Sequence, residues 1–163
     1  MNRIALLSAS LLLAACSGSG SARVNGTVDG TYRIDGQEAR LKYCFVAKGD
    51  KPWNNQPTYM LVFTEQDASA APRIGAITVV NTYGAALVLT AYDKSGNEYS
   101  VIGEDYHHPG LKMPQASGTG TVFLKNVSIA NGEISGEAFT KPDSTMFGQK
   151  VEIDLKFKAP MPK

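Results

Sequence analysis

Short runs of alternating apolar and polar residues follow one another along most of this chain. Alternation over about four to eight residues is typical of a strand with one buried face. The clearest run is residues 151–157, where Val, Ile, Leu and Phe occupy every second position. Turn-forming residues separate the runs, so the pattern predicts an antiparallel sheet built from hairpins.

Two Asp-Gly dipeptides, Asp29-Gly30 and Asp35-Gly36, each predict a tight turn near the start of the domain. Asp-Gly between alternating apolar residues is a strong hairpin signal. Residues 59–64 are continuously apolar, which predicts a central strand. The remaining predicted strands are residues 41–46, 85–92, 97–102, 122–129, 133–139 and 151–157.

Three segments interrupt this pattern. Residues 48–57 form a predicted loop that carries Trp53, the single Trp of the chain. Residues 74–82 fit the apolar stripe of a helix, but their β-branched residues favour a strand, and both interpretations stay open. Residues 103–119 are polar with two Pro, which predicts a long loop; such loops are usually functional or disordered.

The predicted elements therefore number about seven to nine short strands, with no run of helical length between them. This arrangement is typical of an all-β fold, an antiparallel sandwich or a small barrel. The chain has 163 residues, which suits one domain. We expect that domain to span residues 23–163.

The first residues differ from everything that follows. Arg3 precedes an apolar run, residues 4–13, that is shorter than the roughly 20 residues needed to span a bilayer and suits a signal peptide. The run ends in Leu13-Ala14-Ala15-Cys16, which resembles a bacterial lipobox. The resemblance implies a signal peptide of residues 1–15, and a mature chain that begins at a lipidated Cys16. The alternative is an ordinary signal peptide in which Cys16 has no role.

The resemblance also implies a location. Acyl chains on Cys16 would anchor the protein, because burial contributes about 0.8 kcal/mol per CH2. Ser17 in place of Asp implies the outer membrane rather than the inner one, with the domain facing the periplasm. Residues 17–22 are Gly and Ser except for Ala22, which predicts a flexible tether.

The charge balance narrows the range of partners. The chain has 16 Lys and Arg against 15 Asp and Glu, and loss of Arg3 with the signal peptide leaves the mature chain neutral. A neutral domain argues against nucleic-acid binding, which needs a basic face. The lipid would therefore anchor the protein without help from a polybasic segment.

Cys44 is the second of the two Cys residues, so lipidation of Cys16 leaves it without an internal partner. It lies in an apolar run with no His or Asp close in sequence to activate its thiol. The pattern predicts a small buried apolar residue rather than a nucleophile.

The densest group of chemical side chains is Glu104-Asp105-Tyr106-His107-His108. Imidazole nitrogen with carboxylate oxygen suits Zn or Cu, so Glu104, Asp105, His107 and His108 are candidate metal ligands. Adjacent side chains of an extended chain point in opposite directions, however. A shared metal therefore requires a sharp bend, and the alternative is a solvated loop. We predict no resident cofactor.

The loop around Trp53 is the candidate partner-binding surface, together with Tyr59. An aromatic ring among the amides of residues 54–56 suits stacking on a sugar or contact with a protein. The interpretation that the composition favours is that Trp53 caps one end of the core, since Trp is highly buried on average.

No sequence pattern indicates catalysis. A Gly-x-Ser-x-Gly motif is absent, and the Gly-rich residues 118–121 precede a strand rather than a helix. Ile134-Ser135-Gly136, followed by Phe157-Lys158-Ala159-Pro160, resembles small secreted bacterial β-domains of unassigned function, and that resemblance implies no activity.

The expected function is that of a non-enzymatic envelope lipoprotein whose β-domain binds a periplasmic protein or peptidoglycan. The alternatives are a metal-binding lipoprotein that uses residues 104–108, and a β-domain that carries a lipid.

Overall fold

The structure is a computed structural model that describes residues 24–49, 51–71, 82–95 and 98–162. These residues form eleven strands, and every strand pairing among them is antiparallel. The predicted all-β antiparallel fold is therefore confirmed. The strands are β1 Gly26–Ile34, β2 Gln37–Ala39, β3 Tyr43–Lys48, β4 Thr58–Thr64, β5 Ala86–Asp93, β6 Tyr99–His107, β7 Ala116–Gly118, β8 Val122–Ala130, β9 Glu133–Thr140, β10 Thr145–Met146 and β11 Gln149–Pro160.

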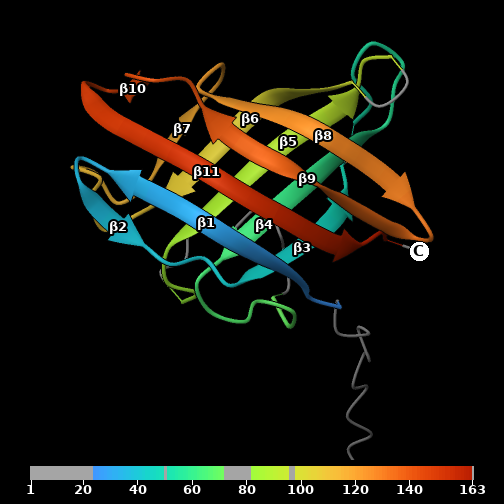
Figure 1. The fold of residues 1–163 in the computed structure, drawn as a ribbon, viewed down its shortest axis with the longest axis horizontal. Coiled ribbons are helices and arrows are strands. Elements are labelled where there is room, and N and C mark those ends of the chain that lie inside the picture. Colours follow the sequence, from blue (N-terminus) through green and yellow to red (C-terminus); the bar gives the residue numbers. More distant parts are fainter. Residues whose placement is uncertain (1–23, 50, 72–81, 96–97, 163) are drawn as a thin grey trace, which may run out of the picture.

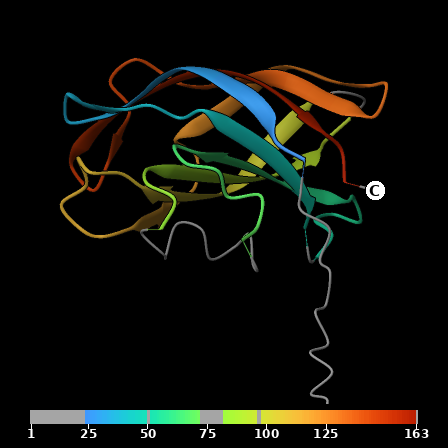
Figure 2. The ribbon, with the colours of Figure 1, turned by 90° about the horizontal axis from the view of Figure 1, so that it is seen from below.

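One curled sheet contains these strands in the order β7-β6-β5-β4-β3-β1-β11-β9-β8, with β2 paired to β1 and β10 paired to β11. The sheet curls into a half-barrel, so its two halves face each other as layers. Strands β1, β11, β9 and β8 form one layer, and strands β3 to β7 cross behind it (Figure 1). Seen from the side, the layers enclose the space between them (Figure 2).

The main hydrophobic core lies between the two layers. Strand β11 contributes the regularly alternating residues that the sequence predicted, and Val151, Ile153, Leu155 and Phe157 are all buried. The Phe157 ring meets the Phe63 ring edge to face, with centroids 5.5 Å apart. Burying each such side chain contributes about 1.5 to 3 kcal/mol, so this core provides much of the stability.

A second, smaller core covers the opposite face of β3, β4 and β5. Phe45, Val62 and Val88 point outward from these strands and are buried, in a cluster that includes Ala68 and Ala71. Strand β4 therefore packs on both of its faces and pairs with a strand on each side. This explains why its sequence is continuously apolar, and the prediction of a central strand is confirmed.

The predicted turn at Asp29-Gly30 is wrong. Strand β1 runs through both residues, and Gly30 pairs with Leu155 of β11. Gly30 has a φ of 125°, and a Cβ atom there would lie 2.0 Å from the Asp154 carbonyl oxygen. The glycine therefore allows the close approach of β11 rather than a chain reversal.

Two other turns lie where the sequence predicted them. Asp35 and Gly36, with φ values of 48° and 79°, reverse the chain between β1 and β2. Asn131 and Gly132, with φ values of 53° and 75°, join β8 to β9. Positive φ at both central residues is the geometry that such hairpins require.

The predicted long loop at residues 103–119 is correct for residues 108–115 and 119 but wrong at both ends. Strand β6 continues through Glu104 to His107, and β7 adds a short strand beyond it. The sequence also gave no sign of β10, which forms a hairpin with β11 through Phe147 and Gly148.

Several predictions lie outside the described residues. These are the signal peptide, Cys16, the tether and residues 74–81 of the segment that fitted both helix and strand. Among the residues described, no helix has the length and apolar character to cross a membrane.

Candidate functional site

The predicted metal ligands alternate between the two faces of β6 and the loop that follows it. Glu104 is 1% exposed on the inner face, whereas Asp105 lies on the opposite face, where the Ser117 hydroxyl donates to its Oδ1 at 2.5 Å. His108 is buried, and the ring Nδ1 of His107 lies 2.8 Å from the Pro114 carbonyl oxygen. The alternation expected of extended backbone therefore separates the side chains.

Glu104 has a structural arrangement of its own. Its Oε1 accepts hydrogen bonds from the backbone N–H groups of Thr121 and Val122, both at 2.8 Å. Its Oε2 accepts from the Tyr106 hydroxyl at 2.7 Å. Thr121 and Val122 lie at the start of β8, so this carboxylate joins β6 to the strand at the other end of the curled sheet.

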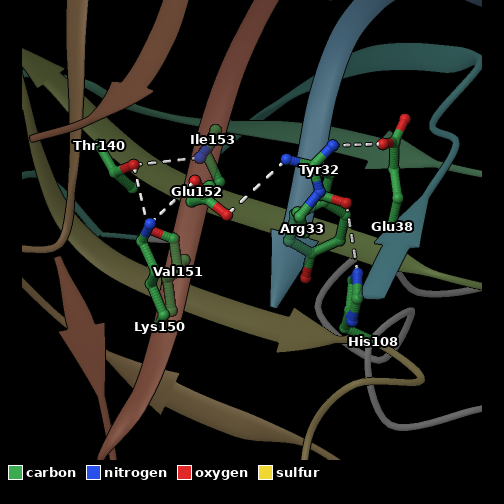
Figure 3. Close-up of polar contacts among 9 residues, drawn as sticks. All are labelled: Tyr32, Arg33, Glu38, His108, Thr140, Lys150, Val151, Glu152 and Ile153. Carbon is green, nitrogen blue, oxygen red and sulfur yellow. Dashed lines mark hydrogen bonds and ion pairs between the residues drawn. The ribbon is translucent and has the colours of Figure 1, made fainter. Parts of the chain in front are cut away.

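The imidazole of His108 also has its partners within the protein. Its Nδ1 accepts from the Gly110 N–H at 2.9 Å, which leaves Nε2 to donate to the Tyr32 carbonyl oxygen at 3.3 Å (Figure 3). The ring packs edge to face on Tyr32, with centroids 4.6 Å apart. Burial lowers the pKa of His108, so the neutral ring is favoured.

The four candidate ligands therefore form no shared centre. Across the parts of the chain described here, no group of three or more His, Cys, Asp or Glu side chains could hold a metal ion. The geometry gives a structural role to Glu104 and His108 instead.

Cys44 matches its prediction as a small buried residue. It is a free Cys in the main core, fully removed from solvent. Burial raises the pKa of its thiol, which disfavours the reactive thiolate.

The outer face of β1 and β11 carries charges that pair with one another. Arg33 lies between two carboxylates, with nitrogen–oxygen distances of 2.7 Å to Glu38 and 3.8 Å to Glu152 (Figure 3). The hydrogen bond to Glu38 raises the pKa of Arg33. Lys150 also pairs with Glu152 at 3.2 Å. Exposed pairs of this kind contribute little stability, and they leave no patch of a single sign here.

Trp53 does not cap the core, and that interpretation is wrong. Its side chain is 48% exposed in the loop between β3 and β4. Trp53 and Gln56 exchange two backbone hydrogen bonds, of 2.9 and 2.8 Å, around a tight turn. Asn54 and Asn55 occupy the turn with φ values of 48° and 61°, which Asn tolerates well. The turn displays the aromatic ring instead of burying it.

The exposed ring borders a groove of about 530 Å³ on the outer face of the β4–β6 layer. Its lining includes two residues with apolar side chains, Met60 and Ile102, a residue that bears a hydroxyl, Thr90, and a residue that bears an ammonium group, Lys51. Sequence analysis identified Trp53 but missed these four residues. Thr90 pairs with Met60 across β4 and β5, and only the strand register brings such residues to the loop.

Tyr59, the second candidate for partner binding, is not part of this groove. It is adjacent to Met60 on β4, so its side chain points to the other face and packs against the main core. The structure therefore separates Tyr59 from Trp53.

Comparisons with protein-family models, curated proteins and solved structures give no match for this chain.

Proposed function

We propose that this chain is a non-enzymatic binding module of the bacterial cell envelope, anchored by lipid at Cys16, with the Trp53 groove as its contact surface. The observation that carries the proposal is the exposed Trp53 ring, held on an ordered turn beside a groove. Exposed Trp residues at pockets are frequent anchors of binding interfaces.

The sequence supports the anchored location. Leu13-Ala14-Ala15-Cys16 resembles the modification signal of lipoproteins, and the Gly and Ser composition of residues 17–22 is typical of a tether. Strand β1 begins at Gly26, a few residues after that connection. A domain so close to its anchor samples partners in the envelope, either a periplasmic protein or a cell-wall component.

Co-purification of binding partners from cell envelopes tests whether the Trp53 groove is the contact surface. The wild-type chain, Trp53→Ala and Phe147→Ala would be purified from solubilised envelopes with whatever they retain. Phe147 is the matched control, because it is also an exposed aromatic residue, 62% exposed, but lies at the β10–β11 turn. We expect Trp53→Ala to lose a specific partner that the wild type and Phe147→Ala retain. Equal recovery by all three proteins would contradict the groove as the contact surface.

A further inference from the structure

We infer that the Trp53 groove binds a pyranose sugar that carries a carboxylate, as part of a cell-wall glycan. The inference rests on the proposed function, and it specifies the chemistry of the partner. Four observations support it: the order of the loop, the lining of the groove, the pairing of the strands beneath it and the charge of Lys51.

Hydrogen bonds fix the backbone that carries Trp53 before any ligand binds. The Gly49 N–H donates to the Thr58 carbonyl oxygen at 2.8 Å, and the Thr58 hydroxyl donates to the Lys51 carbonyl oxygen at 2.7 Å. Together with the Trp53–Gln56 pair, these bonds fix the described backbone at the base of the loop and at its tip. A preorganised surface loses less conformational entropy on binding, which favours a small ligand.

The lining suits a ligand that is apolar on its faces and polar at its edges. The Trp53 ring, Met60 and Ile102 offer apolar contact, while Thr90 offers a hydroxyl. Among the residues described by the structure, that hydroxyl has no hydrogen-bond partner. A pyranose ring presents C–H groups on its face and hydroxyl groups around its edge, and a volume of about 530 Å³ accommodates one or two such rings.

The strands beneath the groove disfavour an extended peptide. Strand β4 is paired with β3 and β5, and β5 is paired with β4 and β6. Their backbone hydrogen-bonding groups are therefore used within the sheet. A peptide that binds by strand addition needs an unpaired edge, which this floor does not provide. The strands that form the floor of the groove therefore offer only side chains, and an aromatic ring beside residues that bear hydroxyl groups favours a sugar.

The charge of the groove indicates which substituent the bound sugar carries. Lys51 is exposed, and among the residues that the structure describes it forms no ion pair and the groove lining includes no carboxylate. An exposed ammonium group at the edge of the groove complements an anionic ligand. A carboxylate on the sugar ring meets this requirement.

Two disaccharides of equal size test the inference by isothermal titration calorimetry on the full chain in detergent. The first is N-acetylglucosaminyl-N-acetylmuramic acid, which carries a carboxylate, and the second is the neutral N,N′-diacetylchitobiose. We expect the acidic sugar to bind at least about fivefold more tightly, by way of its charge-assisted contact. Trp53→Ala should weaken its binding at least about tenfold, as expected for an aromatic anchor.

Two further variants complete the experiment. Lys51→Met should lower the affinity for the acidic sugar to that for the neutral one and leave the neutral sugar unaffected. Phe147→Ala should leave the affinity for both sugars unchanged. All three side chains are exposed, so an unchanged unfolding midpoint would show that the fold is intact.

The outcomes separate this inference from the proposed function. Equal affinity for both sugars, or binding that Trp53→Ala leaves unchanged, would overturn the acidic-sugar site. Failure of both sugars to bind, while a partner is still retained through Trp53, would overturn the inference and leave the proposed function standing. Failure of both experiments would overturn both.

Discussion

Glu104 accepts three hydrogen bonds in a site that solvent does not reach. Two of its donors are the backbone N–H groups of Val122, the first residue of β8, and of Thr121 just before it, and the third is a phenol on β6. Burial and the bond to Glu104 raise the pKa of Tyr106, so the phenol keeps its proton and remains a donor. A carboxylate can accept from all three donors because both of its oxygen atoms are acceptors. An amide has a single oxygen atom and therefore cannot replace it.

Replacing Glu104 with Gln is therefore expected to destabilise the protein by about 2 to 4 kcal/mol. The amide would turn an N–H group toward a donor that needs an acceptor. Urea unfolding of both proteins measures the difference. Tyr106→Phe is the control, since it removes one bond and should cost about 1 kcal/mol. Equal losses from the two variants would show that Glu104 does not join the ends of the sheet.

Gly30 is a second residue whose identity follows from its surroundings. We expect Gly30→Ala to lower the free energy of unfolding by about 3 kcal/mol. The new methyl group would meet the Asp154 carbonyl oxygen, and the positive φ angle of this position disfavours alanine. Gly36→Ala is the matched control, since Gly36 also has a positive φ but no atom within 4 Å of the added Cβ position. It should cost about 1 kcal/mol. Thermal unfolding of the two variants compares the values, and similar midpoints would contradict the steric explanation.

At the scale of elements, Gln149 at the start of β11 connects this strand to two separate loops. Its amide nitrogen donates to Asp35 at 2.9 Å and to the Gly110 carbonyl oxygen at 2.7 Å. Its amide oxygen accepts from the Lys112 N–H at 3.0 Å. The Lys150 N–H also donates to Asp35, at 2.7 Å. The β1–β2 turn, the loop after β6 and the start of β11 are therefore fixed together.

Because this connection includes the Asp35 carboxylate, it makes the stability of the protein depend on pH in the acid range. The hydrogen bond from Gln149, and then that from the Lys150 N–H, lower the pKa of Asp35. Because the pKa is lowered in the folded state, ionised Asp35 stabilises the fold. This stabilisation is fully present above the unfolded-state pKa of about 3.9 and is lost as pH falls through the lower folded-state pKa.

Asp35→Asn isolates that contribution, because Asn tolerates the φ of 48° at this position. Between about pH 5 and pH 3, the wild type should lose more stability than the variant, by the contribution of this carboxylate alone. Urea unfolding at each pH measures both slopes. Parallel pH profiles for the two proteins would contradict the role of Asp35.

The strands that the sequence predicted correctly are those in which one face meets the main core. Alternation in β11 and the double burial of β4 leave clear patterns. The polar end of β6 was missed because Glu104 replaces an apolar residue at an inward position and is satisfied by β8, a contact distant in sequence. The Asp-Gly signal at Gly30 was misleading because pairing with β11 decides the local conformation.

The site was predictable only in part. An exposed Trp53 follows from the tight turn at Asn54-Asn55, although average burial suggested the opposite. Met60 and Thr90 become neighbours through the register of β4 and β5, which no local pattern contains. Alternation of neighbouring side chains along β6 does place Glu104 and Asp105 on opposite faces, as expected of extended backbone.

At the scale of the whole molecule, the proposed anchor determines where the domain acts. Cys16→Ala is expected to release the protein from the membrane fraction into the soluble fraction, because no acyl chain could then be buried. Cell fractionation measures the distribution, and the mass of the wild-type chain should show a lipidated N-terminus. Serine in place of Cys44 is the control, and it should leave the distribution unchanged. Retention of Cys16→Ala in the membrane would contradict lipid anchoring.

Strand β1 is paired with β11, the last strand of the chain, from Thr27 opposite Lys158 to Ile34 opposite Val151. Strand β1 pairs over only a few residues with β2 and β3, so its longest pairing waits for a segment more than a hundred residues further along the chain. Closure of the sheet is therefore a long-range step in folding, and we expect it to be slow compared with formation of the local hairpins.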